Sequence, residues 1–382
     1  MASMNVESPI NGTDYPNGHN RPSPTTTTDG RSKAIKWSLL LLNIFFTAVG
    51  TIGGPLLLRL YFIHGGGRRW LSSCLQNAGF PILFIPLLIL YARARAQGVP
   101  PSKFFIEPKL FFASAVIGVL LGFDNFMYAL GLSYIPVSTS ALLFATQLAF
   151  TAIFALLIVK HKFTPYSINS VILMTLGSIM LGLHTNGDRP AGTSKAKYLL
   201  GFFCTLGSAA LAGFIWPSIE YCYSKASRRV NFTTVLQFQL GVAVFATIFS
   251  ITGMLVNNDF KVIPREAREY KLGNGMYYFV LVATAVAFQL AFIGSLGVIF
   301  CTTSLFSGVV SAVLLPLTQI AAVIAYKEKF TGEKGMALAL SLWGFVSYFY
   351  GEYRSTKNND VKRLAQAQTQ AQDQAQAHPS PV

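Results

Sequence analysis

The chain has 382 residues, of which 52% are apolar and only 12% are charged, and its mean hydropathy is +0.47. A soluble domain has about twice this share of charged residues, because polar side chains must cover its surface. The composition therefore excludes a soluble enzyme and a disordered chain, and it predicts an all-α integral membrane protein. The formal net charge of +15 does not indicate a nucleic-acid partner, because the basic residues form short clusters between apolar runs, as they do at lipid headgroups.

Ten apolar stretches follow a polar N-terminal tail, residues 1–33, which we expect to be disordered. Each stretch is long enough to cross about 30 Å of hydrocarbon, so we expect ten transmembrane helices. The C-terminal residues 353–382 include a run of Ala and Gln without an apolar face, and we expect a second disordered tail there. The stretches cover approximately residues 36–58, 71–92, 109–132, 137–159, 165–184, 198–222, 232–256, 276–298, 302–326 and 334–351.

A short sequence recurs at the ends of the fourth and the ninth apolar stretches. KHKFT occupies residues 160–164, and KEKFT occupies residues 327–331. The match divides the membrane region into two five-helix repeats, residues 34–186 and 187–352. Because five is an odd number, the two repeats have opposite orientations in the membrane. Inverted repeats of this kind are typical of transporters that alternate access around a site near the bilayer midplane.

The distribution of basic residues predicts the orientation of the chain. An even number of spans places both termini on the same side of the membrane, and a slight excess of Lys and Arg in the loops of that side predicts that it is cytoplasmic. The inverted repeat explains why the excess is slight, because matching basic helix ends then lie on opposite faces.

Only two acidic residues, Asp124 and Glu220, lie well within the apolar stretches. A carboxylate in hydrocarbon costs at least about 2.5–3.5 kcal/mol, so it must face a cavity or a partner. Taking up a proton removes that cost, so both residues are candidates for proton coupling. Two alternatives stay open, because Asp124 could join two helices through a hydrogen bond and Glu220 could reach the headgroups near the end of its stretch.

Uncharged polar and aromatic side chains within the stretches form a set of candidate binding residues. Asn125 offers two donors and one acceptor, the groups needed to recognise the edge of a heterocycle. Phe214 and Trp216 could stack on a flat ligand, and the alternative is that they pack in the core or at the membrane interface. The amides could equally bond between helices. The candidate binding residues are Gln76, Asn125, Tyr128, Thr139, Gln147, Phe214, Trp216, Gln239 and Gln289.

Missing motifs exclude several classes of protein. No Walker A, HExxH or GxSxG sequence is present, and the four cysteines lie far apart. We therefore expect that the chain is not an enzyme and has no metal site and no cofactor. Anionic substrates usually require basic residues within the membrane, and none lies there, so the pattern favours a neutral, flat, hydrogen-bonding solute that moves with protons.

Short motifs from one known family are spread over about residues 35–355. They are WLSS at 70–73, GFP at 79–81, DNFMY at 124–128, YIPVSTS at 134–140, QLAFT at 147–151, KHKFTP at 160–165, FQL at 238–240 and KEKF at 327–330. Together they resemble the plant purine permease family of the drug/metabolite transporter superfamily. The resemblance implies a ten-helix inverted-repeat fold and proton-coupled uptake of adenine and adenine-type cytokinins at the plasma membrane. Relatives can have a second acid where this chain has Asn125, so the resemblance favours Asp124 as the proton-coupling residue.

We therefore expect a proton-coupled secondary transporter that imports purine bases and cytokinins by alternating access, with Asp124 and then Glu220 as proton-coupling residues. The expected binding roles are recognition of the purine edge by Asn125, Gln147 and Gln289 and aromatic walls formed by Tyr128, Phe214 and Trp216. One alternative is a carrier of another neutral nitrogenous metabolite, such as a vitamin or an alkaloid. A channel or a sensor is the alternative from a different class of protein.

Overall fold

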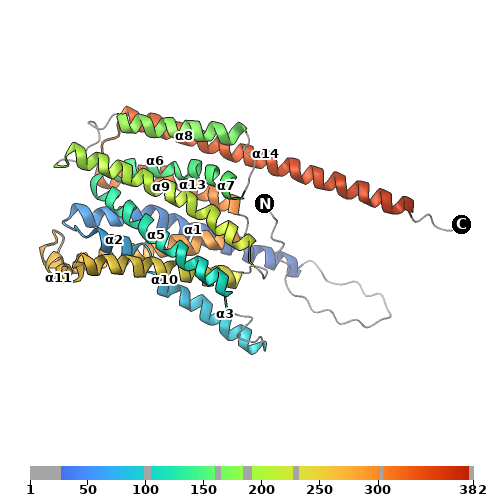
Figure 1. Ribbon diagram of the computed structural model, residues 1–382, viewed down its shortest axis with the longest axis horizontal. Coiled ribbons are helices and arrows are strands. Elements are labelled where there is room, and N and C mark those ends of the chain that lie inside the picture. Colours follow the sequence, from blue (N-terminus) through green and yellow to red (C-terminus); the bar gives the residue numbers. More distant parts are fainter. Residues whose placement is uncertain are drawn as a thin grey trace.

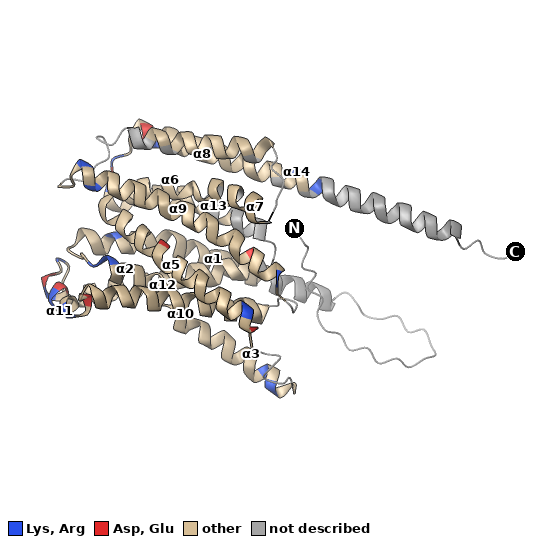
Figure 2. Ribbon diagram, viewed as in Figure 1, with Lys and Arg blue, Asp and Glu red and all other residues tan. Residues whose placement is uncertain are grey.

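Helices form every regular element in the part of the chain that the computed structural model describes, which comprises residues 27–98, 105–159, 165–183, 192–226, 232–301 and 304–377. The long helices lie side by side in one bundle (Figure 1). Among the residues coloured by charge, Lys, Arg, Asp and Glu gather mainly at the two ends of the helices (Figure 2). This distribution is expected of helices that cross a bilayer, because a charged side chain in hydrocarbon is costly.

The elements range from a single short 3₁₀ turn to helices of more than thirty residues. They are α1 (Thr27–Ile63), α2 (Arg69–Leu75), η1 (Phe80–Leu83), α3 (Phe84–Ala96), α5 (Pro108–Tyr134), α6 (Val137–Ala145), α7 (Gln147–Val159), α8 (Pro165–Leu183), α9 (Lys195–Ser224), α10 (Phe232–Val256), α11 (Asp259–Glu269), α12 (Asn274–Cys301), α13 (Ser304–Tyr326) and α14 (Gly332–Ala377).

Every one of the apolar stretches expected from the sequence is helical over most of the residues that the structure describes. Within the described residues, seven helical segments are long and apolar enough to span a membrane. Two further apolar helices, Ile168–Gly177 and Leu314–Tyr326, are shorter. The chain is therefore a multi-pass membrane protein. The seven segments are Trp37–Ile63, Arg69–Ala96, Pro108–Tyr134, Val137–Ile158, Lys195–Ser224, Phe232–Val256 and Asn274–Val298.

Two of the expected helices are interrupted inside their apolar stretches. The stretch 71–92 divides into α2, η1 and α3, with a turn over residues 76–79 between the first two. Pro81, in the first turn of η1, lacks a backbone N–H and therefore cannot continue a regular α-helix from α2. The stretch 137–159 divides into α6 and α7 at Thr146. Both interruptions lie within stretches that are apolar enough on average to span a membrane, so average hydropathy alone does not reveal them.

The two tails differ from the disordered segments that we expected. Helix α14 continues to Ala377, so most of residues 353–382 is helical, and Figure 1 shows this part extending away from the bundle. Ala and Gln are good helix formers, which explains how the helix can continue without an apolar face. At the other end, α1 already begins at Thr27. Residues 1–26 and 378–382 lie outside the described residues, as does the expected boundary between the repeats at 186 and 187.

Helix α5 lies in the middle of the bundle, where it packs against α2, α9 and α10. Close approach to α10 depends on glycine: a Cβ atom at Gly118 would lie 2.7 Å from the carbonyl oxygen of Val242. Small residues allow helices to approach closely in membranes, where packing contacts replace the hydrophobic driving force. The central position of α5 places its polar residues inside the protein.

Glu328, in the loop between α13 and α14, caps the N-terminus of α6. Its carboxylate accepts hydrogen bonds from the backbone N–H groups of Val137 at 2.9 Å and Ser138 at 3.1 Å, and from the Ser138 hydroxyl. The Nζ atom of the buried Lys334 donates to the same hydroxyl at 2.6 Å. The first N–H groups of a helix have no acceptor within the helix, so the carboxylate satisfies two of them and stabilises the positive end of the helix dipole.

We expect Glu328→Ala to lower the free energy of unfolding by about 1–2 kcal/mol, because α6 loses its cap. The thermal unfolding midpoint of the protein in detergent should fall accordingly. Glu269→Ala is a suitable control, because Glu269 pairs with Arg265 across 2.9 Å on an exposed face of α11 and should contribute little. Equal midpoints for the two variants would contradict the capping role of Glu328.

Candidate functional site

Buried amide side chains gather around the turn that follows α2. Gln76 and Asn77 lie in this turn, and their side chains are 4% and 1% exposed. Gln76 Nε2 donates to the backbone oxygen of Asn125 on α5 at 2.9 Å. Gly79 ends the turn against α12, where a Cβ atom would lie 2.5 Å from Cβ of Gln289. Only glycine permits this approach, and the turn thereby lies between Asn125 and Gln289.

We call Gln76, Asn77, Asn125 and Gln289 the amide cluster. Hydrogen-bonding atoms of its side chains are buried without a partner: both side-chain amide atoms of Asn77, Nδ2 of Asn125 and Nε2 of Gln289. Leaving a buried polar group unpaired costs about 1–3 kcal/mol, so native proteins pair almost all of them. The fully buried, unpaired atoms of the cluster are thus three N–H donors and one carbonyl acceptor, the kinds of group that can bind a small polar molecule.

Asp124 precedes Asn125 on α5 and is also buried, with 5% of its surface exposed. Its Oδ1 atom accepts a hydrogen bond from the hydroxyl of Ser208 on α9 at 2.7 Å. Among the described residues, no ion pair joins Asp124 to a basic side chain. The hydrogen bond joins α5 to α9 through Asp124.

Other expected binding residues lie elsewhere in the bundle. Tyr128, one turn after Asp124, is buried and packs edge-to-face on Phe144 of α6 at 5.4 Å between ring centroids. Phe214 on α9 makes a similar contact with Phe154 of α7 at 5.4 Å. Thr139 on α6 is fully buried. These aromatic contacts are between helices, and each therefore also stabilises the bundle.

Four of the expected residues are not buried in the centre. Trp216 is 44% exposed, so its ring lies on the outer surface of α9. Glu220, one turn later, is also exposed. Gln147 at the start of α7 and Gln239 on α10 are partly buried. The structure therefore brings together Gln76, Asn125 and Gln289 beside Asp124, but not Trp216 or Glu220.

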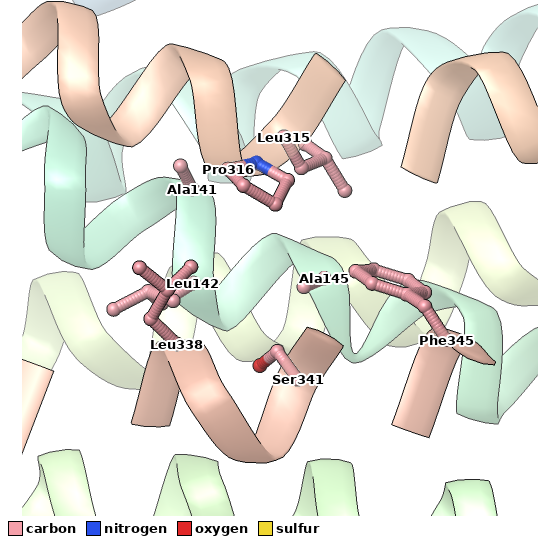
Figure 3. A pocket seen from close by; sticks show the side chains of 8 residues that line it. All are labelled: Ala141, Leu142, Ala145, Leu315, Pro316, Leu338, Ser341 and Phe345. Atoms are coloured by element: carbon pink, nitrogen blue, oxygen red, sulfur yellow. The ribbon is translucent and has the colours of Figure 1, made fainter. Parts of the chain in front are cut away.

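A small cavity between α6, α13 and α14 is separate from the amide cluster (Figure 3). Its volume is about 10 Å³, and its lining is apolar except for Ser341. Such a space is at the lower limit for one water molecule, so it does not accommodate a solute. In the described part of the chain, no three His, Cys, Asp or Glu side chains gather in a group that could hold a metal ion.

A cluster of charged and hydroxyl side chains closes the end of the bundle that holds α11. Glu266 of α11 accepts hydrogen bonds from the hydroxyls of Tyr61 on α1 and Tyr277 on α12, the latter at 3.1 Å. Its other oxygen lies 3.2 Å from the backbone nitrogen of Gly67 and 3.4 Å from Nε of Arg68. We call Tyr61, Arg68, Glu266 and Tyr277 the Glu266 clamp. It joins α1, the loop before α2, α11 and α12.

Further contacts extend the Glu266 clamp along α11. Arg68 also pairs with the buried Asp259 at 3.4 Å, and Asn257 donates to the same carboxylate at 2.7 Å. Tyr270 donates to the backbone oxygen of Leu60 at 3.2 Å. Burial and the nearby Glu266 carboxylate raise the pKa of Tyr270, so its hydroxyl remains protonated and available to donate.

Sequence reasoning missed the Glu266 clamp for an identifiable reason. Glu266 lies in a charged loop between expected spans, and its partner Tyr61 is 205 residues away in the sequence. Arg59 directly follows the first apolar stretch in the sequence, whereas the span in the structure continues to Ile63. This guanidinium is buried and donates to the backbone oxygen of Leu132 at 2.7 Å. The amphipathic character of α11 was a signal that could have revealed a helix in that loop.

Buried polar residues inside a bundle of apolar helices with charged ends define a multi-pass membrane protein with a polar centre. The family model PUNUT, described as purine nucleobase transmembrane transport, matches residues 38–358. The chain therefore belongs to this family of transporters, as the sequence motifs suggested, and it is not an enzyme.

Three relatives from Arabidopsis thaliana illustrate the similarity. The chain is 48% identical to purine permease 3 over 88% of its own length and 97% of that protein. It is 45% identical to purine permease 2, over 86% and 96% of the two chains. The identity to probable purine permease 11 is 36%, over 88% and 87%. Each similarity therefore covers most of both chains.

Proposed function

We propose that this protein is a proton-coupled secondary transporter that imports purine bases, above all adenine, and adenine-type cytokinins. The observation that supports this most directly is the set of unpaired amide atoms of Asn77, Asn125 and Gln289 beside the buried Asp124. Amides form paired hydrogen bonds with purine edges, because an adjacent donor and acceptor match adjacent groups on the ring. Family membership supports a purine nucleobase as the solute.

Within this proposal, Asn125 and Gln289 recognise the purine edge, and Gln76 holds Asn125 through its backbone. Gln147, Gln239 and Thr139 would contact the solute along its path. Tyr128, which lies close to Asp124 on α5, would supply an aromatic wall. Phe214 and Trp216 would form aromatic walls only after a rearrangement of α9, because Trp216 lies on the outer surface in this conformation.

Asp124 is the residue that we propose for proton coupling. Its carboxylate has a hydroxyl partner, Ser208, at 2.7 Å and no basic partner among the described residues. A charged carboxylate without a basic partner in an apolar region is costly. A proton on Asp124 removes this cost, so we propose that protonation favours one conformation of α5 over another. Glu220 is the second proposed site, and its exposure on α9 suits contact with solvent or headgroups.

We propose that ten spans in two inverted repeats, residues 34–186 and 187–352, move by alternating access. The Glu266 clamp would be the barrier that closes the α11 end, and it would have to break when the protein opens there. The start of α1 and the end of α14 lie at the end of the bundle opposite to α11 (Figure 1). We place the protein in the plasma membrane with both termini in the cytoplasm. In this orientation, the α11 end of the bundle faces the outside of the cell.

Uptake of labelled adenine and labelled zeatin into cells that lack purine transport tests this function. We expect uptake to rise as the external pH falls and to stop when a protonophore removes the gradient. Competition by a panel of unlabelled purines, vitamins and alkaloids identifies the preferred solute. Uptake that is independent of pH would contradict proton coupling, and an absence of purine uptake or competition would contradict the proposed solute.

A further inference from the structure

Asn77 is fixed by its backbone, while its side chain has no partner. Its backbone nitrogen donates to the carbonyl of Cys74 at 3.0 Å, and its carbonyl accepts from the nitrogen of Phe80 at 3.0 Å. The turn therefore satisfies the main chain of this residue. Its side chain is only 1% exposed, and both its Nδ2 and Oδ1 atoms lack a hydrogen-bond partner. A fixed backbone with an unpaired buried amide is the geometry of a binding group.

The neighbours of Asn77 place this unpaired amide within the amide cluster. The preceding residue, Gln76, reaches α5 at Asn125, and Gly79 packs directly against Gln289 of α12. Asn125 and Gln289 each present an unpaired N–H donor. Among the fully buried unpaired atoms of the cluster, Oδ1 of Asn77 is thus the acceptor beside three N–H donors.

The donors and the acceptor match the groups of one class of purine. A 6-aminopurine has acceptor nitrogens at positions 1, 3 and 7 of its rings, and its exocyclic amine donates N–H. Three amide donors suit the ring nitrogens, and one amide acceptor suits the amine. Substitution of the amine with a side chain, as in N6-substituted adenines, still leaves one N–H for this acceptor.

We infer that Asn77 is the residue that selects purines with a 6-amino group, through a hydrogen bond from that amine to its Oδ1 atom. The inference rests on the proposed transport of purines and adds the residue that determines the preference within that class. Neither amide atom of Asn77 has a hydrogen-bond partner in the protein, and the neighbouring Gln76 and Gly79 contact α5 and α12 of the amide cluster.

The test compares uptake of adenine with uptake of unsubstituted purine, which has the same rings but no exocyclic amine. One neutral hydrogen bond changes an affinity by about tenfold, so wild type should prefer adenine by about that factor. In Asn77→Leu the preference should fall to about one, because the acceptor is gone. Asn77→Asp keeps an acceptor in the same volume, so it should retain more of the preference than Asn77→Leu.

Gln319→Leu is the matched control. Gln319 lies on α13, is fully buried, and also has two unpaired amide atoms. A general loss of folding would reduce uptake of both bases equally in either variant, and it would leave the ratio unchanged. We expect the ratio to remain near its wild-type value in Gln319→Leu.

The outcomes separate this inference from the proposed function. If wild type takes up neither base, the proposed transport of purines is wrong. If wild type takes up adenine but Asn77→Leu keeps its preference over unsubstituted purine, the role of Asn77 is overturned and transport stands. Equal loss of the preference in Asn77→Leu and Gln319→Leu would also overturn the assignment to Asn77.

Discussion

Replacing Asp124 by Asn is expected to abolish the accumulation of adenine against its gradient while exchange of adenine across the membrane continues. Asn keeps an oxygen that can accept the hydrogen bond from Ser208, so α5 and α9 remain joined. It cannot exchange a proton, so the inward proton gradient no longer drives transport. A pH difference of about 2 units supplies about 2.7 kcal/mol per proton, enough for about 100-fold accumulation. In the variant, accumulation should fall to about one.

The measurement uses purified protein in vesicles with an imposed pH gradient and labelled adenine. Counterflow, in which internal unlabelled adenine drives entry of the label, reports whether the variant still binds and transports the base. Glu220→Gln tests the second proposed site in the same assay, and because its side chain is exposed on α9, we expect a smaller loss of accumulation than in Asp124→Asn. Proton-driven accumulation by Asp124→Asn would remove Asp124 from coupling, and loss of accumulation in Glu220→Gln alone would assign coupling to Glu220.

The fold was predictable from the sequence to the extent that hydropathy determines it. Apart from the interruptions at residues 76–79 and at Thr146, the described parts of the apolar stretches are helical, because a spanning segment must satisfy its own backbone hydrogen bonds. The interruption between α2 and η1 was not predicted, because all side chains from Leu71 to Leu75 are uncharged and buried like those of any spanning helix. Gly79 and Pro81 were the signals of that interruption, although both residues also occur within spanning helices.

The candidate site was predictable only for residues whose type is unusual in a membrane. Asp124, Asn125 and Gln289 stood out because polar groups are rare within apolar stretches, and the structure buries all three. Trp216 is 44% exposed, which fits the alternative of a position at the membrane interface, because the sequence of a uniformly apolar helix does not show which face is buried. The hydrogen bond between Tyr61 and Glu266 joins segments that are far apart in the sequence. The periodicity of a single sequence does not show which distant segments are in contact.

The Glu266 clamp gives a second large expected effect, on the opening of the α11 end. Cys74 is a free, buried cysteine that belongs to the same apolar cluster as Tyr61 and Tyr277 of the clamp. In a protein with Cys204, Cys222 and Cys301 replaced by Ser, a membrane-impermeant thiol reagent therefore reports opening of this end. The wild-type clamp should keep labelling of Cys74 slow.

We expect Glu266→Ala to speed the labelling of Cys74 by about tenfold or more. The variant removes the acceptor of two tyrosine hydroxyls and of Arg68, and a hydrogen bond to a charged group contributes about 1.5–3 kcal/mol. About 1.4 kcal/mol changes the ratio of open to closed protein tenfold. Glu266→Gln keeps an acceptor for the tyrosines but loses the charge that Arg68 pairs with, so its labelling rate should be intermediate.

Two controls connect the labelling rate to the Glu266 clamp. Glu269→Ala changes an exposed carboxylate on the same helix, so its labelling rate should equal that of the wild type. Reagent added to one face of oriented vesicles identifies the side on which the α11 end opens. If Glu266→Ala labels no faster than Glu269→Ala, the clamp does not close this end. If faster labelling requires reagent on the cytoplasmic face, the clamp closes the inner end and the orientation proposed for the termini is wrong.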